Sequence, residues 1–305
     1  MKSPLQGLIA APHTPFSPQG ELAEAVIPRQ AALLMHNGVS GAFICGTTGE
    51  GSSLTQAERR RVAEAWRAAA DERLKVIVHV GHLCGAESAD LARHAEQIGA
   101  DAIAAIAPSF FRPPSVHELV AWCASVASAA PRTPFFYYHM PAMTGVHVPV
   151  ADFIPEAEKR IPTFAGIKFT HEDLMDYGQS VALARDKYRM LFGRDEVLLS
   201  ALALGADGAV GSTYNYAAPL YLRLIESFRA GRLDDARADQ ARSRAFIALL
   251  GPYGGFAAGK AIMKLIGVDC GPVRLPLRAM DDSTERALRA ALDKVGFFEH
   301  CSRLP

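Results

Sequence analysis

One lysine stands in the middle of an apolar run that has the length of a β-strand. The run is FAGIKFT, residues 164–170, and the lysine is Lys168. Lysine is rarely buried without a partner or a chemical role, because removing an ammonium group from water is costly. Burial lowers the pKa of a lysine, and the neutral amine can attack a ketone or aldehyde to form a Schiff base. The alternative is a strand-end lysine whose long side chain reaches solvent.

A glycine-rich turn is the second chemical signal. It reads GTTGEG at residues 46–51 and contains Thr47 and Thr48. The backbone N–H groups and the two hydroxyls of such a turn could hold a carboxylate or a phosphate. The alternative is a tight turn that only caps a helix expected from residue 55.

Tyr138 is a candidate for moving a proton. It belongs to the run PFFYYH, residues 134–139. Side chains alternate between the two faces of a strand, so only one of Tyr137 and Tyr138 can face the centre of a closed sheet. A phenol beside a lysine and an anion-binding turn could shuttle protons. The alternative is an aromatic side chain that fills the core.

Two further apolar runs of strand length are followed by polar residues. These polar stretches are GRDE at 193–196 and GSTYN at 211–215. They suit a ligand rich in hydroxyls, although charges that open a helix are also ordinary capping residues.

The run GGFAAGK at 254–260 matches the start of a P-loop, but Ala261 stands where Ser or Thr would hold magnesium, and no strand precedes it. The histidines lack the helical spacing of a zinc site. The sequence therefore predicts no metal site.

The elements that must position these residues alternate regularly along the chain. Apolar runs of strand length alternate with stretches of helical periodicity, as in βα units. We expect strands at residues 7–11, 39–45, 75–80, 102–107, 134–139, 164–169, 188–193 and 208–211. We expect helices between and after them at 22–35, 55–71, 87–98, 116–129, 150–158, 172–184, 196–204 and 219–230.

Eight such units in ~225 residues are typical of a TIM (β/α)8 barrel, an α/β fold whose catalytic groups stand at the C-terminal ends of the strands. A doubly wound open sheet is the alternative, but PHTP follows the first strand where a nucleotide-binding G-x-G-x-x-G would stand. Further helices are expected at 233–250, 257–266 and 282–295. We therefore predict a catalytic barrel at residues 1–230 and a C-terminal helical extension at 231–305 packed on it.

Composition points to a small-molecule partner. Lys plus Arg and Asp plus Glu each number 32, so the formal charge is zero and there is no electrostatic basis for binding nucleic acid or an anionic membrane. The five cysteines are scattered and odd in number, which argues against a disulfide framework. Pro4 interrupts any signal peptide, and no run of about 18 residues is apolar. We expect a cytoplasmic protein.

With these motifs the chain resembles the pyruvate-dependent class I aldolases typified by dihydrodipicolinate synthase and N-acetylneuraminate lyase. The resemblance covers residues 5–277 and rests on the motifs at 46–51, 138–142, 166–168 and 211–215. It is strongest to the animal-type lyases, in YYHMPAMTGV at 137–146 and VGSTYNY at 210–216. It implies a TIM barrel with a helical extension, a homotetramer and no cofactor.

The resemblance also implies residue roles. Lys168 corresponds to the Schiff-base lysine, Tyr138 to a proton-relay tyrosine acting as phenolate, and Thr47 and Thr48 to the residues that hold the substrate carboxylate. The positions that correspond to sugar-binding residues are Thr170, Gly193, Asp195, Glu196 and Ser212. The implied reaction is the reversible cleavage of N-acetylneuraminate, a sialic acid, into pyruvate and N-acetylmannosamine.

The sequence departs from the synthases at two places. Ser109-Phe110-Phe111 occupies the loop where the synthases carry a tyrosine that crosses a subunit interface, and Met143 occupies the place of a carboxylate-binding arginine. Both departures favour a lyase over dihydrodipicolinate synthase. A 2-keto-3-deoxy-sugar-acid aldolase is another alternative. A non-catalytic sialate or pyruvate sensor on the same barrel would need neither Lys168 nor Tyr138.

Overall fold

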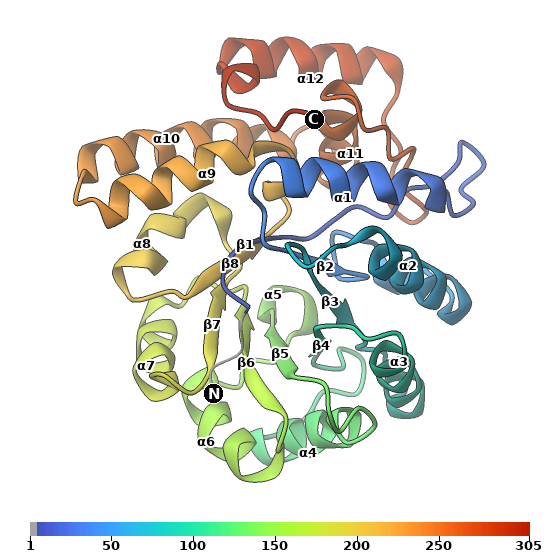
Figure 1. Cartoon of the computed structure of the whole chain (residues 1–305), viewed down its shortest axis with the longest axis vertical. Helices are drawn as coiled ribbons and strands as arrows, with labels where there is room; N and C mark the ends of the chain where they lie inside the picture. Colours follow the sequence, from blue (N-terminus) through green and yellow to red (C-terminus); the bar gives the residue numbers. More distant parts are fainter. Residues whose placement is uncertain (1–4) are drawn as a thin grey trace.

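The computed structural model describes residues 5–305, which form a closed barrel of parallel strands (Figure 1). The strands are β1 (Gly7–Ala10), β2 (Gly41–Ile44), β3 (Lys75–His79), β4 (Ala102–Ile106), β5 (Phe135–His139), β6 (Phe164–Phe169), β7 (Arg189–Phe192) and β8 (Gly208–Gly211). Each strand pairs with the next, and β8 pairs with β1, so the barrel has no open edge. The predicted TIM barrel is confirmed.

Helices ring the barrel on its outside (Figure 1). They are α1 (Ile27–His36), α2 (Gln56–Ala69), α3 (Gly85–Gln97), α4 (Val116–Ala127), α6 (Val150–Arg160), α7 (Leu174–Ala184), α8 (Leu198–Ala203) and α9 (Tyr214–Arg229). Each corresponds to a predicted helix. The short helix α5 (Pro141–Thr144) was not predicted, because one turn is too short to show helical periodicity.

Among the helices that begin at other residues than predicted, α1, α8 and α9 have an irregular turn at or near their start. A 3-10 turn precedes α1 at Glu24–Val26, and another precedes α8 at Asp195–Val197. Helix α9 begins before the predicted start at Pro219, with a kink at Ala217. Proline cannot donate a backbone hydrogen bond and therefore interrupts the helical ladder at the kink.

A short repeat connects helices to strands. Gly99 follows α3 and Gly205 follows α8, both in the left-handed region at φ +73° and +96°, where glycine carries no steric penalty. The aspartates two residues later, Asp101 and Asp207, each accept a hydrogen bond at 2.9 Å from a backbone N–H of the preceding strand. In each repeat the glycine thus ends the helix, and the aspartate bonds the connection after that helix to a barrel strand.

The core has two layers. Side chains inside the barrel form a small cluster that includes Phe43, Phe136 and Tyr138. A larger cluster lies between the strands and the surrounding helices and includes Tyr137 and Phe169. Neighbouring residues of one strand therefore belong to different layers, as strand alternation requires.

The C-terminal helices lie together beside α1 and α9 (Figure 1). They are α10 (Leu233–Leu250), α11 (Phe256–Leu265) and α12 (Asp282–Lys294). The tail then returns to the kink of α9. The Ser302 N–H donates to the Tyr216 carbonyl at 2.7 Å, and the Ser302 hydroxyl accepts from the Ala218 N–H at 3.3 Å. This contact satisfies backbone groups that the kink leaves open.

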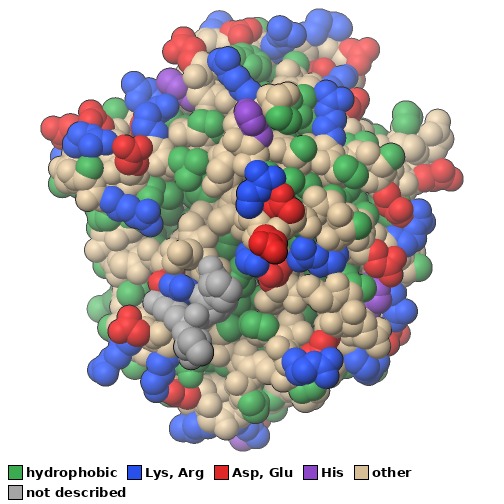
Figure 2. Space-filling view, viewed as in Figure 1, with side chains coloured by type: hydrophobic (Ala, Val, Ile, Leu, Met, Phe, Trp, Pro, Cys, Tyr) green, Lys and Arg blue, Asp and Glu red, His purple; other side chains and the backbone are tan. Residues whose placement is uncertain are grey.

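Cationic and anionic side chains are interspersed over the face shown in Figure 2, and no single-sign patch dominates it. Within residues 5–305, no helix is long and apolar enough to cross a membrane.

Candidate active site

The nine predicted site residues line one cavity of about 210 Å³ at the C-terminal end of the barrel. They come from β5, β6 and the loops after β2, β6, β7 and β8. Lining residues that sequence reasoning did not assign are Ala11, Met140, Arg194, Val210, Gly211, Thr213, Ile247, Leu250 and Phe256. Thr213 lies in a motif already noted. The last three belong to α10 and α11, and no sequence signal linked them to the barrel.

Lys168 lies on the inner face of β6 with 4% of its surface exposed, so the solvent-reaching alternative is wrong. Its Nζ lies 3.9 Å from the ring centroid of Phe43 and 4.0 Å from that of Tyr138. Burial lowers the pKa of Lys168 to about 7, although the charge of Asp195 opposes the shift. A large share of the amine is therefore neutral at physiological pH and able to act as a nucleophile.

An irregularity in β6 turns Lys168 inward. Ala165 and Lys168 both face the barrel interior, although residues three apart on a regular strand point to opposite sides. The register with β5 shifts between Phe135 and Phe136, which accommodates one additional residue in β6. Gly166 makes this possible, because a Cβ there would lie 2.2 Å from the Arg189 carbonyl oxygen.

Tyr138 pairs with Lys168 across β5 and β6 and also faces the interior, whereas Tyr137 faces the helices. The Tyr138 ring packs edge-on against Phe43 and His79, at centroid distances of 5.5 and 5.9 Å. Its hydroxyl lies 3.3 Å from Thr47 Oγ1 and donates to Met140 Sδ at 2.9 Å. Burial raises the pKa of Tyr138, so the free protein carries a phenol here.

The glycine-rich turn has a backbone that few residues can adopt. Cys45 and Glu50 are left-handed, with φ of +56° and +52°. A Cβ at Gly51 would lie 1.9 Å from the Cys45 carbonyl oxygen, so only glycine fits there. The Thr14 hydroxyl donates to the Gly49 carbonyl at 2.6 Å and holds the turn from the side of β1.

The polar groups of this turn are available to a ligand. Helix α2 has its own capping box, in which Thr55 Oγ1 accepts from the Glu58 N–H and the Glu58 carboxylate accepts from the Thr55 N–H. The turn is therefore not needed to cap α2. Within residues 5–305, no hydrogen bond uses the N–H groups of Thr47 or Thr48. Such N–H groups beside hydroxyls suit a carboxylate.

The cavity wall also holds a buried carboxylate. Asp195 is 5% exposed, and its Oδ2 accepts from the N–H and the hydroxyl of Thr213 at 3.1 and 2.5 Å. In the described chain neither Asp195 Oδ1 nor Thr170 Oγ1 has a hydrogen-bond partner. Burial raises the pKa of Asp195 to about 6, with the bonds from Thr213 opposing the shift. Two unsatisfied oxygens in one cavity suit the hydroxyls of a ligand.

Two glycines make room for these oxygens. A Cβ at Gly211 would lie 1.9 Å from Asp195 Oδ1, and a Cβ at Gly193 would lie 2.0 Å from Thr170 Oγ1. Gly193 therefore contributes space to the cavity.

Glu196 is paired, in contrast to Asp195. Arg194 Nε donates to Glu196 Oε1 at 2.8 Å, and the same guanidinium bonds Glu172 at 2.8 Å. The charge of Glu196 is thereby partly offset, because Glu172 shares the same guanidinium. Ser212 completes the wall after β8.

The pKa of Lys168 gives a testable pH dependence. We expect the rate of Schiff-base trapping with pyruvate and cyanoborohydride to rise with pH and to level off above a midpoint near 7, because only the neutral amine attacks. An amine with the unshifted pKa of 10.5 would show no plateau in this range. Asp195→Asn should move the midpoint to lower pH, since it removes a charge that favours the ammonium form. A midpoint unchanged by Asp195→Asn would contradict this electrostatic coupling.

Among residues 5–305, no three His, Cys, Asp or Glu side chains are arranged to hold a metal ion. A buried lysine of lowered pKa beside a tyrosine, at the C-terminal end of a TIM barrel, has the groups that Schiff-base chemistry requires. The sequence matches the Dihydrodipicolinate synthetase family over residues 4–295, and the chain belongs to that family.

Named relatives place the chain more narrowly. It is 44% identical to the N-acetylneuraminate lyase of Mus musculus over 301 residues, covering 97% of this chain and 94% of the mouse protein. The Proteus mirabilis N-acetylneuraminate lyase structure matches with a TM-score of 0.93 and 42% identity, over 96% of this chain and 99% of that one. The native sialic acid aldolase of Aliivibrio salmonicida matches with a TM-score of 0.94 and 41% identity, over 97% and 98%.

Proposed function

We propose that this protein is a class I aldolase that reversibly cleaves N-acetylneuraminate to pyruvate and N-acetylmannosamine. The observation that carries the proposal is the buried Lys168 amine, with a pKa of about 7, in contact with Tyr138 in a cavity that Thr47 and Thr48 also line. Relatives that are 41–44% identical over most of the chain are named for this reaction.

Thr47 and Thr48 bind the substrate carboxylate and thereby bring the C2 ketone to Lys168. The Lys168 amine adds to C2, and loss of the C2 oxygen as water gives a protonated iminium. The Tyr138 phenol donates the proton that this leaving hydroxyl needs. The phenolate expected from the resemblance then arises during the reaction, stabilised by the positive charge of the iminium beside it.

Bond cleavage uses the iminium as the electron sink. The electrons of the C3–C4 bond move into the iminium, and the C4 hydroxyl proton passes to the Tyr138 phenolate. The products at this stage are N-acetylmannosamine and an enamine of pyruvate on Lys168. Protonation at C3 and hydrolysis release pyruvate and restore the amine. Thr170, Asp195, Glu196 and Ser212 bind the sugar hydroxyls, and Gly193 provides the space beside them.

Substrate choice provides the test of this function. We expect kcat/KM for condensation with pyruvate to favour N-acetylmannosamine over aspartate semialdehyde by at least about 10²-fold, because the second carboxylate would lose water without gaining a cation. Among the described cavity-lining residues, the cations are Lys168 and Arg194, and Arg194 is already paired. Met143, which stands where the synthases have a carboxylate-binding arginine, lies on α5 and is 56% exposed.

Both aldehydes should be assayed with the same pyruvate concentration, and pyruvate release from N-acetylneuraminate should be measured in parallel. A ratio in favour of aspartate semialdehyde would assign the protein to the synthases instead. If the protein binds N-acetylneuraminate but releases no pyruvate, it would instead be a non-catalytic sialate sensor.

We further propose a homotetramer in the reducing cytoplasm. Phe110 and Phe111, in the loop after β4, are 76% and 86% exposed and pack edge-on against each other at 5.0 Å. Exposed aromatic pairs of this kind favour burial against another subunit. The five cysteines are all unpaired, which supports a reducing compartment.

A further inference from the structure

Lys260, the lysine of the P-loop-like run, is buried outside the cavity. It lies on α11 with 3% of its side chain exposed and forms an ion pair of 2.8 Å with Glu50 Oε1. Its Nζ also donates to the Pro272 carbonyl at 2.7 Å and lies 4.2 Å from the centroid of the Phe16 ring. Lys260 therefore has three fixed partners, and the ion pair with Glu50 connects it to the glycine-rich turn.

Glu50 belongs to the turn that carries Thr47 and Thr48. Its side chain is 1% exposed, and its second oxygen, Oε2, accepts from the Arg274 N–H at 2.9 Å. Both oxygens of this carboxylate are thus bound by the C-terminal extension.

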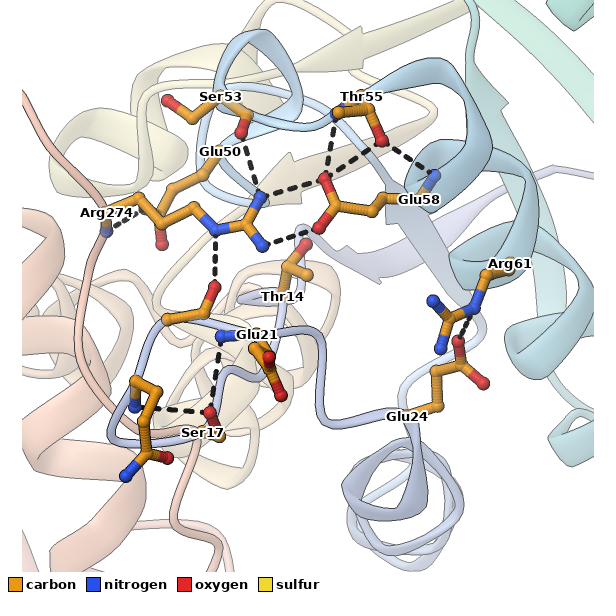
Figure 3. Close-up of polar contacts among 12 residues, drawn as sticks. Thr14, Ser17, Glu21, Glu24, Glu50, Ser53, Thr55, Glu58, Arg61 and Arg274 are labelled. Atoms are coloured by element: carbon orange, nitrogen blue, oxygen red, sulfur yellow. Dashed lines mark hydrogen bonds and ion pairs between the residues drawn. The ribbon is translucent and has the colours of Figure 1, made fainter.

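Arg274 binds the other end of the same segment (Figure 3). Its guanidinium donates to both carboxylate oxygens of Glu58, at 2.9 and 2.5 Å, and to the Ser53 carbonyl at 3.0 Å. It also donates to the Gly20 carbonyl at 2.9 Å. The pKa of Glu58 falls to about 2, mainly because of Arg274. The extension therefore holds the segment from Glu50 to Glu58 at two points.

The turn needs support of this kind, because the left-handed conformations of Cys45 and Glu50 are unfavourable for residues with a Cβ. We propose that Lys260 and Arg274 are positioning residues, which hold the turn so that Thr47 and Thr48 can bind the substrate carboxylate. This inference rests on the proposed function. It goes further by assigning affinity for the carboxylate to the helical extension.

A buried ion pair contributes little net stability, but loss of one partner leaves an uncompensated charge. Without Lys260, the Glu50 carboxylate would move towards water and displace the turn. The binding of the carboxylate should then weaken, while the Lys168 amine, on a different strand, should react as before.

The test compares pyruvate with hydroxyacetone, a neutral ketone in which a hydroxymethyl group replaces the carboxylate. Lys260→Met should raise the pyruvate concentration for half-maximal cyanoborohydride trapping by about tenfold or more, and change that for hydroxyacetone less than about threefold. Lys264→Met is the matched control, since Lys264 lies on the same helix but is half-exposed and paired with Glu285 at 2.8 Å. It should leave both values unchanged.

A second variant separates positioning from folding. Glu50→Gln with Lys260→Met leaves no unpaired charge, so its thermal unfolding should approach that of the wild type. The pyruvate concentration for half-maximal trapping should stay raised several-fold, because the turn has lost the ion pair that holds it to α11. If the single variant does not fold, this double variant decides the question. Wild-type trapping of pyruvate in the double variant, or an equal loss for both ketones, would overturn the inference. A wild-type protein that cannot be trapped with pyruvate at all would instead overturn the proposed function.

Discussion

Lys168→Ala is expected to lower kcat/KM for N-acetylneuraminate cleavage by at least about 10⁴-fold, because no other amine lines the cavity within the described chain. Without the iminium, the electrons of the C3–C4 bond have no acceptor. Pyruvate release should be measured by a coupled assay. In parallel, wild-type protein treated with pyruvate and borohydride should carry a stable adduct that mass spectrometry locates on Lys168, and the variant should carry none.

Lys260 is the control for this assignment, since it is the other buried lysine of the described chain. Its ion pair with Glu50 should keep it free of adduct. The Lys168→Ala protein should also unfold at or above the wild-type temperature, because the substitution removes a buried, poorly solvated amine. Retained turnover in Lys168→Ala, or an adduct on Lys260, would refute the role of Lys168.

Tyr138→Phe is expected to lower kcat by about 10²- to 10⁴-fold, the usual contribution of a positioned acid or base. The phenyl ring would still pack against Phe43 and His79, so the cavity should keep its shape. The hydroxyl beside Thr47 would be lost, and with it the group that moves the proton. Pyruvate should still be trapped on Lys168, although more slowly, because the phenol also protonates the leaving C2 hydroxyl. An adduct that forms without turnover would show that cleavage fails after the carbonyl has bound.

Tyr137→Phe provides the matched comparison. The Tyr137 ring stacks on Phe153 outside the barrel, at a centroid distance of 4.4 Å, and should tolerate loss of its hydroxyl with little change in turnover. The single-turnover rate and the trapping rate should be measured for both variants. If Tyr137→Phe lost activity and Tyr138→Phe did not, the tyrosine assignment would be reversed.

Much of the barrel and of the site could be read from local sequence. Strand-length apolar runs alternated with helical periodicity, and that alternation depends on burial patterns that each segment shows by itself. The polar motifs followed predicted strands, and the ends of parallel strands converge on one face of a barrel. Alternation along β5 also required that only one of Tyr137 and Tyr138 face the barrel interior, and the structure shows that it is Tyr138. These inferences needed only neighbouring residues and one topological rule.

Other properties depended on contacts between distant parts of the chain. The irregularity that turns Lys168 inward is a property of how β5 and β6 pair, and it contradicts simple alternation from Ala165. The pKa of Lys168 depends on its full desolvation, which no single segment specifies. The pairing of Glu50 with Lys260 joins the turn after β2 to α11. The sequence by itself determined which groups could react, whereas the tertiary structure decided their orientation, their protonation and what holds them, because these depend on burial and on long-range contacts.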